Sequence, residues 1–66
     1  MSAPAPPTGV IFETRVIGTL VRMTAIDIAT GTEAVIQGPA SASQADLRQL
    51  ALRKLDYVLK RAISQK

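Results

Sequence analysis

"AIDIATGTEAVIQGPASAS", residues 25–43, decides the fold, because it contains one turn within a predicted sheet and the turn that leads to a predicted helix. Glycine beside Thr and Ser occurs both in phosphate-binding loops and in ordinary turns. The spacing here favours turns, since no Lys-Ser or Lys-Thr follows either glycine and no helix is predicted to begin at Gly31. We therefore predict two turns and no nucleotide-binding loop.

The first turn, "DIATG", connects two predicted strands at about residues 19–27 and 32–38. Asp27 can accept hydrogen bonds from the backbone amides ahead of it. Gly31 can adopt the left-handed conformation that closes a type I turn. The sequence thus predicts a β-hairpin at this point.

Residues 10–27 are rich in β-branched side chains and are interrupted only by Gly18. We expect two strands, at about 10–16 and 19–27, that are connected by a tight turn or a bulge at Gly18. One long bent strand is the alternative. Residues 1–9 contain three of the four prolines and are predicted to be a disordered Pro-rich tail, so that residues 10–66 form a single small domain.

A long helix is predicted over residues 44–63, which contain many helix formers and neither Gly nor Pro. Pro39 should end the preceding strand, and "SQAD" at 43–46 has the form of a capping box. The predicted fold is therefore α+β: a small antiparallel β-meander of two or three strands, followed by one C-terminal amphipathic helix that packs on the sheet (β-β-β-α).

The apolar side chains of this helix fall within an arc of roughly 160°, which is expected to pack on the sheet. They are Leu47, Ala51, Leu52, Leu55, Val58, Leu59, Ala62 and Ile63. Arg48 projects near the centre of the same arc. We expect its stem to pack and its head either to reach solvent at the helix end or to pair with Glu13 or Asp27, with a role in ligand binding as the alternative.

Leu50 and Tyr57 lie on the polar side of the helix, two turns apart and between basic residues, which is typical of a contact surface. The candidate partner-binding residues are Leu50, Arg53, Lys54, Tyr57, Lys60 and Arg61.

A chain of 66 residues without cysteine has only a small core and no disulfide to support it. Apolar residues also point to both sides of the predicted sheet, since Leu20 and Ile26 alternate with Val21, Met23 and Ala25. We therefore expect a homodimer, formed sheet-to-sheet or edge-to-edge, with a marginal monomer as the alternative. The candidate dimer-interface residues are Leu20, Arg22, Ile26 and Val35.

An enzyme is not expected, because the chain contains neither His nor Cys, and no catalytic residue, metal ligand or cofactor is predicted. No signal peptide or membrane-spanning segment is predicted, which favours the cytoplasm and no membrane association. The leading hypothesis is a non-catalytic protein–protein interaction and dimerisation module that binds a larger protein. The alternative is a nucleic-acid-binding accessory protein that uses the basic outer face of the helix, in keeping with a net charge of +3.

The pattern AID-x-x-TG-x-E, then GPA, then LALRKL-x-YVL resembles a family of short bacterial proteins of unknown function. The matching positions are Ala25–Asp27, Thr30–Glu33, Gly38–Ala40 and Leu50–Leu59, with Ile28 where proline is common. The resemblance implies a small stand-alone domain and no particular activity. It also implies that part of the helix surface predicted above belongs to the recurring motif.

Overall fold

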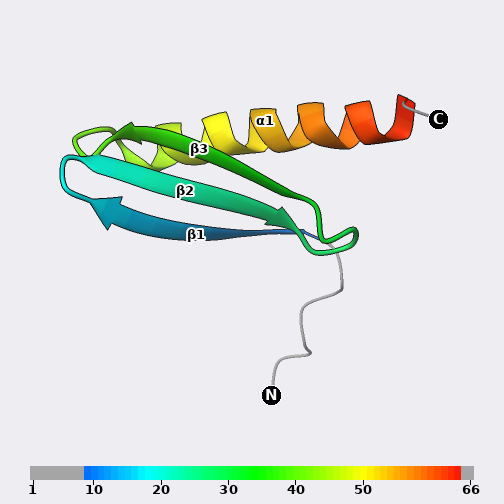
Figure 1. Cartoon of the computed structure of the whole chain (residues 1–66), viewed down its shortest axis with the longest axis horizontal. Helices are drawn as coiled ribbons and strands as arrows, with labels where there is room; N and C mark the ends of the chain where they lie inside the picture. Colours follow the sequence, from blue (N-terminus) through cyan, green and yellow to red (C-terminus); the bar gives the residue numbers. More distant parts are fainter. Residues whose placement is uncertain (1–8, 65–66) are drawn as a thin grey trace, which may run out of the picture.

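The computed structural model describes residues 9–64 and contains three strands followed by one helix (Figure 1). The elements are β1 (Val10–Ile17), β2 (Leu20–Asp27), β3 (Glu33–Pro39) and α1 (Gln44–Ser64). The strands form one antiparallel sheet in the order β1-β2-β3, and α1 packs on β2 and β3. The predicted β-β-β-α fold is confirmed. Apart from Gly9, the predicted tail lies outside the described residues.

Residues 10–27 form two strands and not one bent strand. Ile17 pairs with Leu20 across a two-residue loop in which Gly18 has a φ of 61°. A glycine with positive φ at the first central position, followed by Thr19 with negative φ, is the pattern of a type II′ turn. This turn suits the right-handed twist of the strands, so β1 and β2 pair in register along their whole length.

The second hairpin is held by the Asp27 side chain, as the sequence predicted. Its carboxylate accepts hydrogen bonds from the Thr30 backbone N–H at 3.1 Å and from the Thr30 hydroxyl at 2.7 Å. Gly31 has a φ of 73°, and its N–H donates to the Asp27 carbonyl at 2.7 Å. β3 then ends at Pro39, one residue later than predicted, because a proline is tolerated where its missing N–H would point away from the neighbouring strand.

Ser43 caps the helix. Its hydroxyl accepts a hydrogen bond from the Asp46 backbone N–H at 3.0 Å, and its carbonyl accepts one from the Leu47 N–H at 3.1 Å. Asp46 also places a negative charge in the first turn, where the helix dipole favours it. The hydrogen bonds that Ser43 accepts therefore fix where α1 begins.

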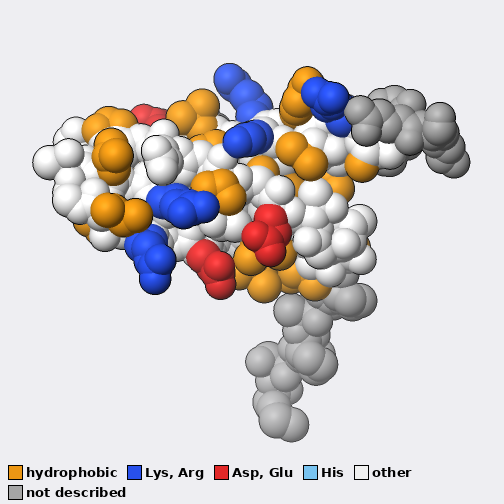
Figure 2. Space-filling model, viewed as in Figure 1, with side chains coloured by type: hydrophobic (Ala, Val, Ile, Leu, Met, Phe, Trp, Pro, Cys, Tyr) orange, Lys and Arg blue, Asp and Glu red, His pale blue; other side chains and the backbone are white. Residues whose placement is uncertain are grey.

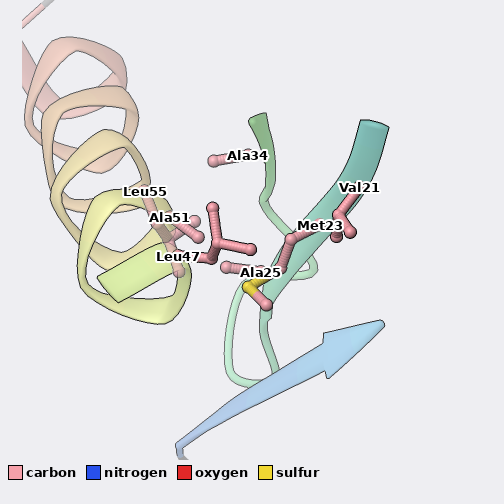
Figure 3. Close-up of a cluster of buried hydrophobic side chains, with 7 residues drawn as sticks. All are labelled: Val21, Met23, Ala25, Ala34, Leu47, Ala51 and Leu55. Carbon is pink, nitrogen blue, oxygen red and sulfur yellow. The ribbon is translucent and has the colours of Figure 1, made fainter. Parts of the chain in front are cut away.

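The core lies between α1 and the two strands beneath it (Figure 3). Three of its side chains come from β2, one from β3 and three from the helix. They are Val21, Met23, Ala25, Ala34, Leu47, Ala51 and Leu55. Three of the seven are alanines, which allow close approach of the helix to the sheet but contribute little apolar area.

The predicted packing face of the helix is too broad, since Leu52 is 41% exposed and Ala62 is exposed. The helix lies over β2 and β3, so that a side chain on its β1 flank finds no strand beneath it. In addition, a helix of 21 residues is about 31 Å long and a strand of eight residues only about 26 Å, so the last turns pass beyond the sheet (Figure 1). The side chain of Ile63 is not among those described.

Arg48 is exposed, which fits the first of the two arrangements expected for it, and the alternative ion pair with Glu13 or Asp27 is not formed within residues 9–64. The packing of α1 is centred on Leu47, Ala51 and Leu55, which places Arg48 on the flank with its head in water. The carboxylate of Asp27 is instead bonded to Thr30.

Gly38 lies directly beneath Leu47 of the helix, and we predict that Gly38→Ala destabilises the fold. A Cβ at this position would lie 2.6 Å from Leu47 Cδ2, so the buried Leu47 side chain, which is only 2% exposed, would have to shift within the core. Overpacking of this kind lowers the free energy of unfolding by about 1–3 kcal/mol, measurable by urea denaturation. Gln37→Ala, an exposed neighbour on the other side of β3, should change it by less than about 0.5 kcal/mol. Equal stability of the two variants would show that Leu47 repacks freely.

Candidate interaction surfaces

Two surfaces gather the residues that the sequence singled out. The first is the side of the sheet opposite α1, here called the open face. The second is the outer flank of the helix, here called the helix stripe. It consists of Leu50, Arg53, Lys54, Tyr57, Lys60 and Arg61, all of which are exposed.

Strand alternation defines the open face. Because Val21, Met23 and Ala25 are buried beneath the helix, the residues between them on β2 point to the other side, and the register assigns their neighbours on β1 and β3. Charged and hydrophobic side chains both lie on the open face. The charged ones lie over the middle of the strands and the hydrophobic ones towards the ends (Figure 2). The members of the open face are Ile11, Glu13, Arg15, Ile17, Leu20, Arg22, Thr24, Ile26, Glu33, Val35, Gln37 and Pro39.

The four candidate dimer-interface residues all lie on the open face, but they do not form one patch. Leu20 and Ile26 are near opposite ends of β2, and the charged side chain of Arg22 lies between them. Leu20 is 45% exposed, whereas Ile26 and Val35 are half-buried. The open face is therefore divided into apolar ends and a polar centre.

The polar centre contains two arginines directly opposite each other, Arg15 on β1 and Arg22 on β2. They line a shallow depression together with Glu13, Thr14 and Thr24. Neither arginine forms an ion pair with any residue in the part of the chain that the structure describes. Like charges that face each other across a strand pair are destabilising, and Glu13 is the acidic residue that lines the depression beside them.

The helix stripe adjoins the outer edge of β3. Lys54 Nζ donates a hydrogen bond to the Val35 carbonyl at 2.7 Å, which ties the stripe to the strand. Leu50 and Tyr57 are 49% and 58% exposed on either side of this lysine. A groove continues from Leu50 and Lys54 across β3 to Arg22, so that the stripe and the open face meet at this edge.

The basic side chains at the C-terminal end of the stripe make local contacts. Lys60 Nζ lies 2.9 Å from the Asp56 carboxylate, in an exposed i,i+4 ion pair. The Arg61 guanidinium lies 5.7 Å from the centre of the Tyr57 ring and donates to the Tyr57 hydroxyl at 3.1 Å. Part of the positive charge is therefore neutralised, and the face of the tyrosine that a base would stack on is shared with Arg61.

The sequence analysis missed β1 as a surface. Val16 is 65% exposed although it points to the same side as α1, and Ile11 and Ile17 on the open face are 49% and 52% exposed. The width of a helix could have predicted this, because one helix is too narrow to cover three strands. Because β1 is the strand farthest from the helix, Val16 is left uncovered on the side of α1, while Val10 and Phe12 still pack against the edge of the core.

Asp27 and Glu33, which flank the same hairpin, do not form a carboxylate pair. Asp27 is bonded to Thr30, while Glu33 lies on the open face opposite Ile26. Among the described residues, no three acidic side chains are grouped so that they could hold a metal ion. No helix in residues 9–64 is long and apolar enough to cross a membrane.

A family model described as a domain of unknown function, DUF6898, matches residues 7–62, which include all three strands and most of the helix. The chain belongs to the DUF6898 family. No curated protein and no solved structure matches it. The function of this DUF6898 domain therefore has to be argued from its own surfaces.

Lys54 protects the outer edge of β3, and we predict that Lys54→Ala exposes that edge at little cost in stability. The lost hydrogen bond is exposed, so the free energy of unfolding should fall by no more than about 1 kcal/mol. An unpaired edge without its lysine is more prone to strand addition, so light scattering on storage should rise faster than for the wild type. Arg53→Ala, which removes the same charge one residue away, is the matched control. Equal scattering by the two variants would contradict the protective role.

Proposed function

We propose that this DUF6898 domain is a small non-catalytic protein–protein interaction module that acts as a homodimer in the cytoplasm. The main support for the proposal is that α1 covers only part of the sheet. It leaves four large aliphatic side chains between 45% and 65% exposed on β1 and at the start of β2. They are Ile11, Val16, Ile17 and Leu20.

A second subunit would supply burial that a single chain lacks. Complete burial of one large aliphatic side chain contributes about 1.5–3 kcal/mol, and several such side chains are available on β1 alone. Among the described residues seven hydrophobic side chains are buried in the core, and three of these are alanines. Contact between two copies is a common means by which small domains gain stability.

We propose a non-catalytic role because the chain lacks the side chains that most often act as catalysts. Without His or Cys, the usual general bases and nucleophiles are missing from the chain. Asp27 and Glu33 flank the same hairpin, but the Asp27 carboxylate accepts hydrogen bonds from Thr30 and Glu33 lies on the open face.

The homodimer is tested by sedimentation equilibrium over a range of protein concentrations. We expect a reversible monomer–dimer equilibrium, and a thermal midpoint that rises with concentration because the dimer stabilises the fold by mass action. A mass that stays monomeric at the highest concentration, with a constant thermal midpoint, would refute the dimer.

The helix stripe is the surface we propose for a larger protein partner. Leu50 lines a groove beside β3, and Tyr57 and Arg53 are exposed residues of types that are enriched at protein interfaces. The stripe faces away from the core, so that binding there requires no change in the packing of α1.

Nucleic-acid binding through the same helix is the alternative function. It draws on the net charge of +3 and on the exposed Arg53 and Lys54. Against it stand the Lys60–Asp56 ion pair and the packing of Arg61 on Tyr57. We favour a protein partner for these reasons.

We predict that Leu50→Ala and Tyr57→Ala each lose the partner while the fold is kept, because both side chains are exposed and contribute little to the core. The measurement is affinity purification at native expression level, quantified against wild type, with circular dichroism to confirm folding. Gln49→Ala, on an adjoining part of the exposed helix surface, is the control and should retain the partner. If both test variants retain every partner, the stripe is not the binding site. Binding of DNA or RNA that falls steeply with added salt would favour the alternative function.

A further inference from the structure

We propose that two copies of this chain pair through the outer edges of their β1 strands. The product is one continuous six-stranded antiparallel sheet, in which Thr14 faces Thr14 of the second copy on a two-fold axis. This inference rests on the homodimer proposed above, and it specifies the edge and the register.

The backbone of β1 is available for such pairing. A two-residue hairpin loop makes Ile17 and Leu20 exchange both backbone hydrogen bonds, so every second residue before Ile17 also points its N–H and C=O at β2. The Gly9 carbonyl, which accepts from the Ile28 N–H at 3.0 Å, fits this alternation. The N–H and C=O groups of Val10, Phe12, Thr14 and Val16 therefore point outwards, and the unbroken register of β1 contains no proline and no bulge.

The outer edge of β3 is less suited to pairing. Lys54 occupies the outward-pointing carbonyl of Val35, and Pro39 has no N–H to donate. A lysine and a proline are two of the devices by which proteins prevent pairing at an edge strand. β1 has neither, so within residues 9–64 the edge that remains open is the one at β1.

The side chains of β1 are self-complementary about Thr14. The sequence of residues 11–17 is "IFETRVI". Antiparallel pairing centred on Thr14 puts Glu13 opposite Arg15 of the second copy, Phe12 opposite Val16 and Ile11 opposite Ile17. By symmetry each of these contacts occurs twice.

Neighbouring registers lack this match. Moving the two-fold axis by one residue puts either Glu13 opposite Glu13 or Arg15 opposite Arg15. Both arrangements place like charges face to face at the centre of the interface, which is unfavourable for a strand pair. The charges therefore select one register.

The same register resolves the two unexplained features of β1. Val16, the most exposed large hydrophobic side chain among the described residues, would lie against Phe12 of the second copy, on the side of the sheet that carries both helices. Arg15, which faces Arg22 across the strand pair, would gain Glu13 of the second copy on its other side. Packing of two open faces against each other would instead bury Arg15 and Arg22 together with Glu13 and Glu33, and the desolvation of so many charges is costly.

A cysteine at the axis tests the register directly, because the natural chain has no cysteine. In a hydrogen-bonded antiparallel pair the two Cα atoms are about 5.5 Å apart, which a disulfide can span. Thr14→Cys should therefore give a covalent dimer under mild oxidation. Thr19→Cys, in the hairpin loop, should not, because in this register the two copies of residue 19 would be ten residues out of alignment, or about 33 Å apart.

Charge reversal tests the Glu13–Arg15 contacts. Glu13→Arg and Arg15→Glu should each weaken the homodimer by about tenfold or more, because two attractive contacts become repulsive. A mixture of these two variants should form a heterodimer of near wild-type affinity, since every contact is again between opposite charges. Glu33→Arg, which makes the same charge change on β3, should leave the affinity unchanged.

The outcomes separate the two proposals. A wild-type chain that is monomeric at all concentrations overturns both the homodimer and the β1 pairing. A wild-type dimer that shows no crosslink through Thr14→Cys, or no weakening by Glu13→Arg and Arg15→Glu, overturns the β1 pairing alone and leaves a homodimer built on another surface. Crosslinking at position 14, together with restored affinity in the mixture, supports the β1 pairing.

Discussion

The width of one α-helix limits how much of this sheet the chain can cover. Strands lie about 4.8 Å apart, and a helix with its side chains is about 10–12 Å across, so one helix covers two strands and not three. In this molecule those strands are β2 and β3, which supply every strand residue of the buried core. The exposure of Val16 on β1 follows from this limit, whereas Ile11 and Ile17 are exposed because they lie on the open face, which α1 does not cover.

The features that the sequence predicted are those fixed by local chemistry. Asp27 and Gly31 define a hairpin within five residues, and Ser43 with Asp46 defines the start of α1. Alternation along β2 also separated Val21 and its buried neighbours from Leu20 on the open face. Each of these conclusions needs only residues that are close together in the chain, so no knowledge of the tertiary arrangement is required.

What the sequence could not predict depends on where the helix lies across the sheet. The helical wheel assigned Leu52 and Ala62 to the same packing face as Leu47, but only Leu47 is buried. The position of a residue around the helix axis does not show whether a strand lies beneath it. The exposure of Leu50 and Tyr57 could be predicted, since these two lie on the far side of the wheel from the core. The groove beside Lys54, in contrast, depends on the contact of this lysine with Val35, nineteen residues away in the chain.

The two edges of the sheet differ because α1 reaches only one of them. The helix lies over β2 and β3, so Lys54 can extend to a carbonyl at the outer edge of β3, while the outer edge of β1 is the one farthest from it. Protection of β1 would have to come from its own side chains, and like charges there would repel a second copy. The two charged residues of β1, Glu13 and Arg15, are instead opposite in sign and lie symmetrically about Thr14. They favour the approach of another β1 strand, so the strand that the helix cannot cover has the side-chain pattern of a contact and not of a protected edge.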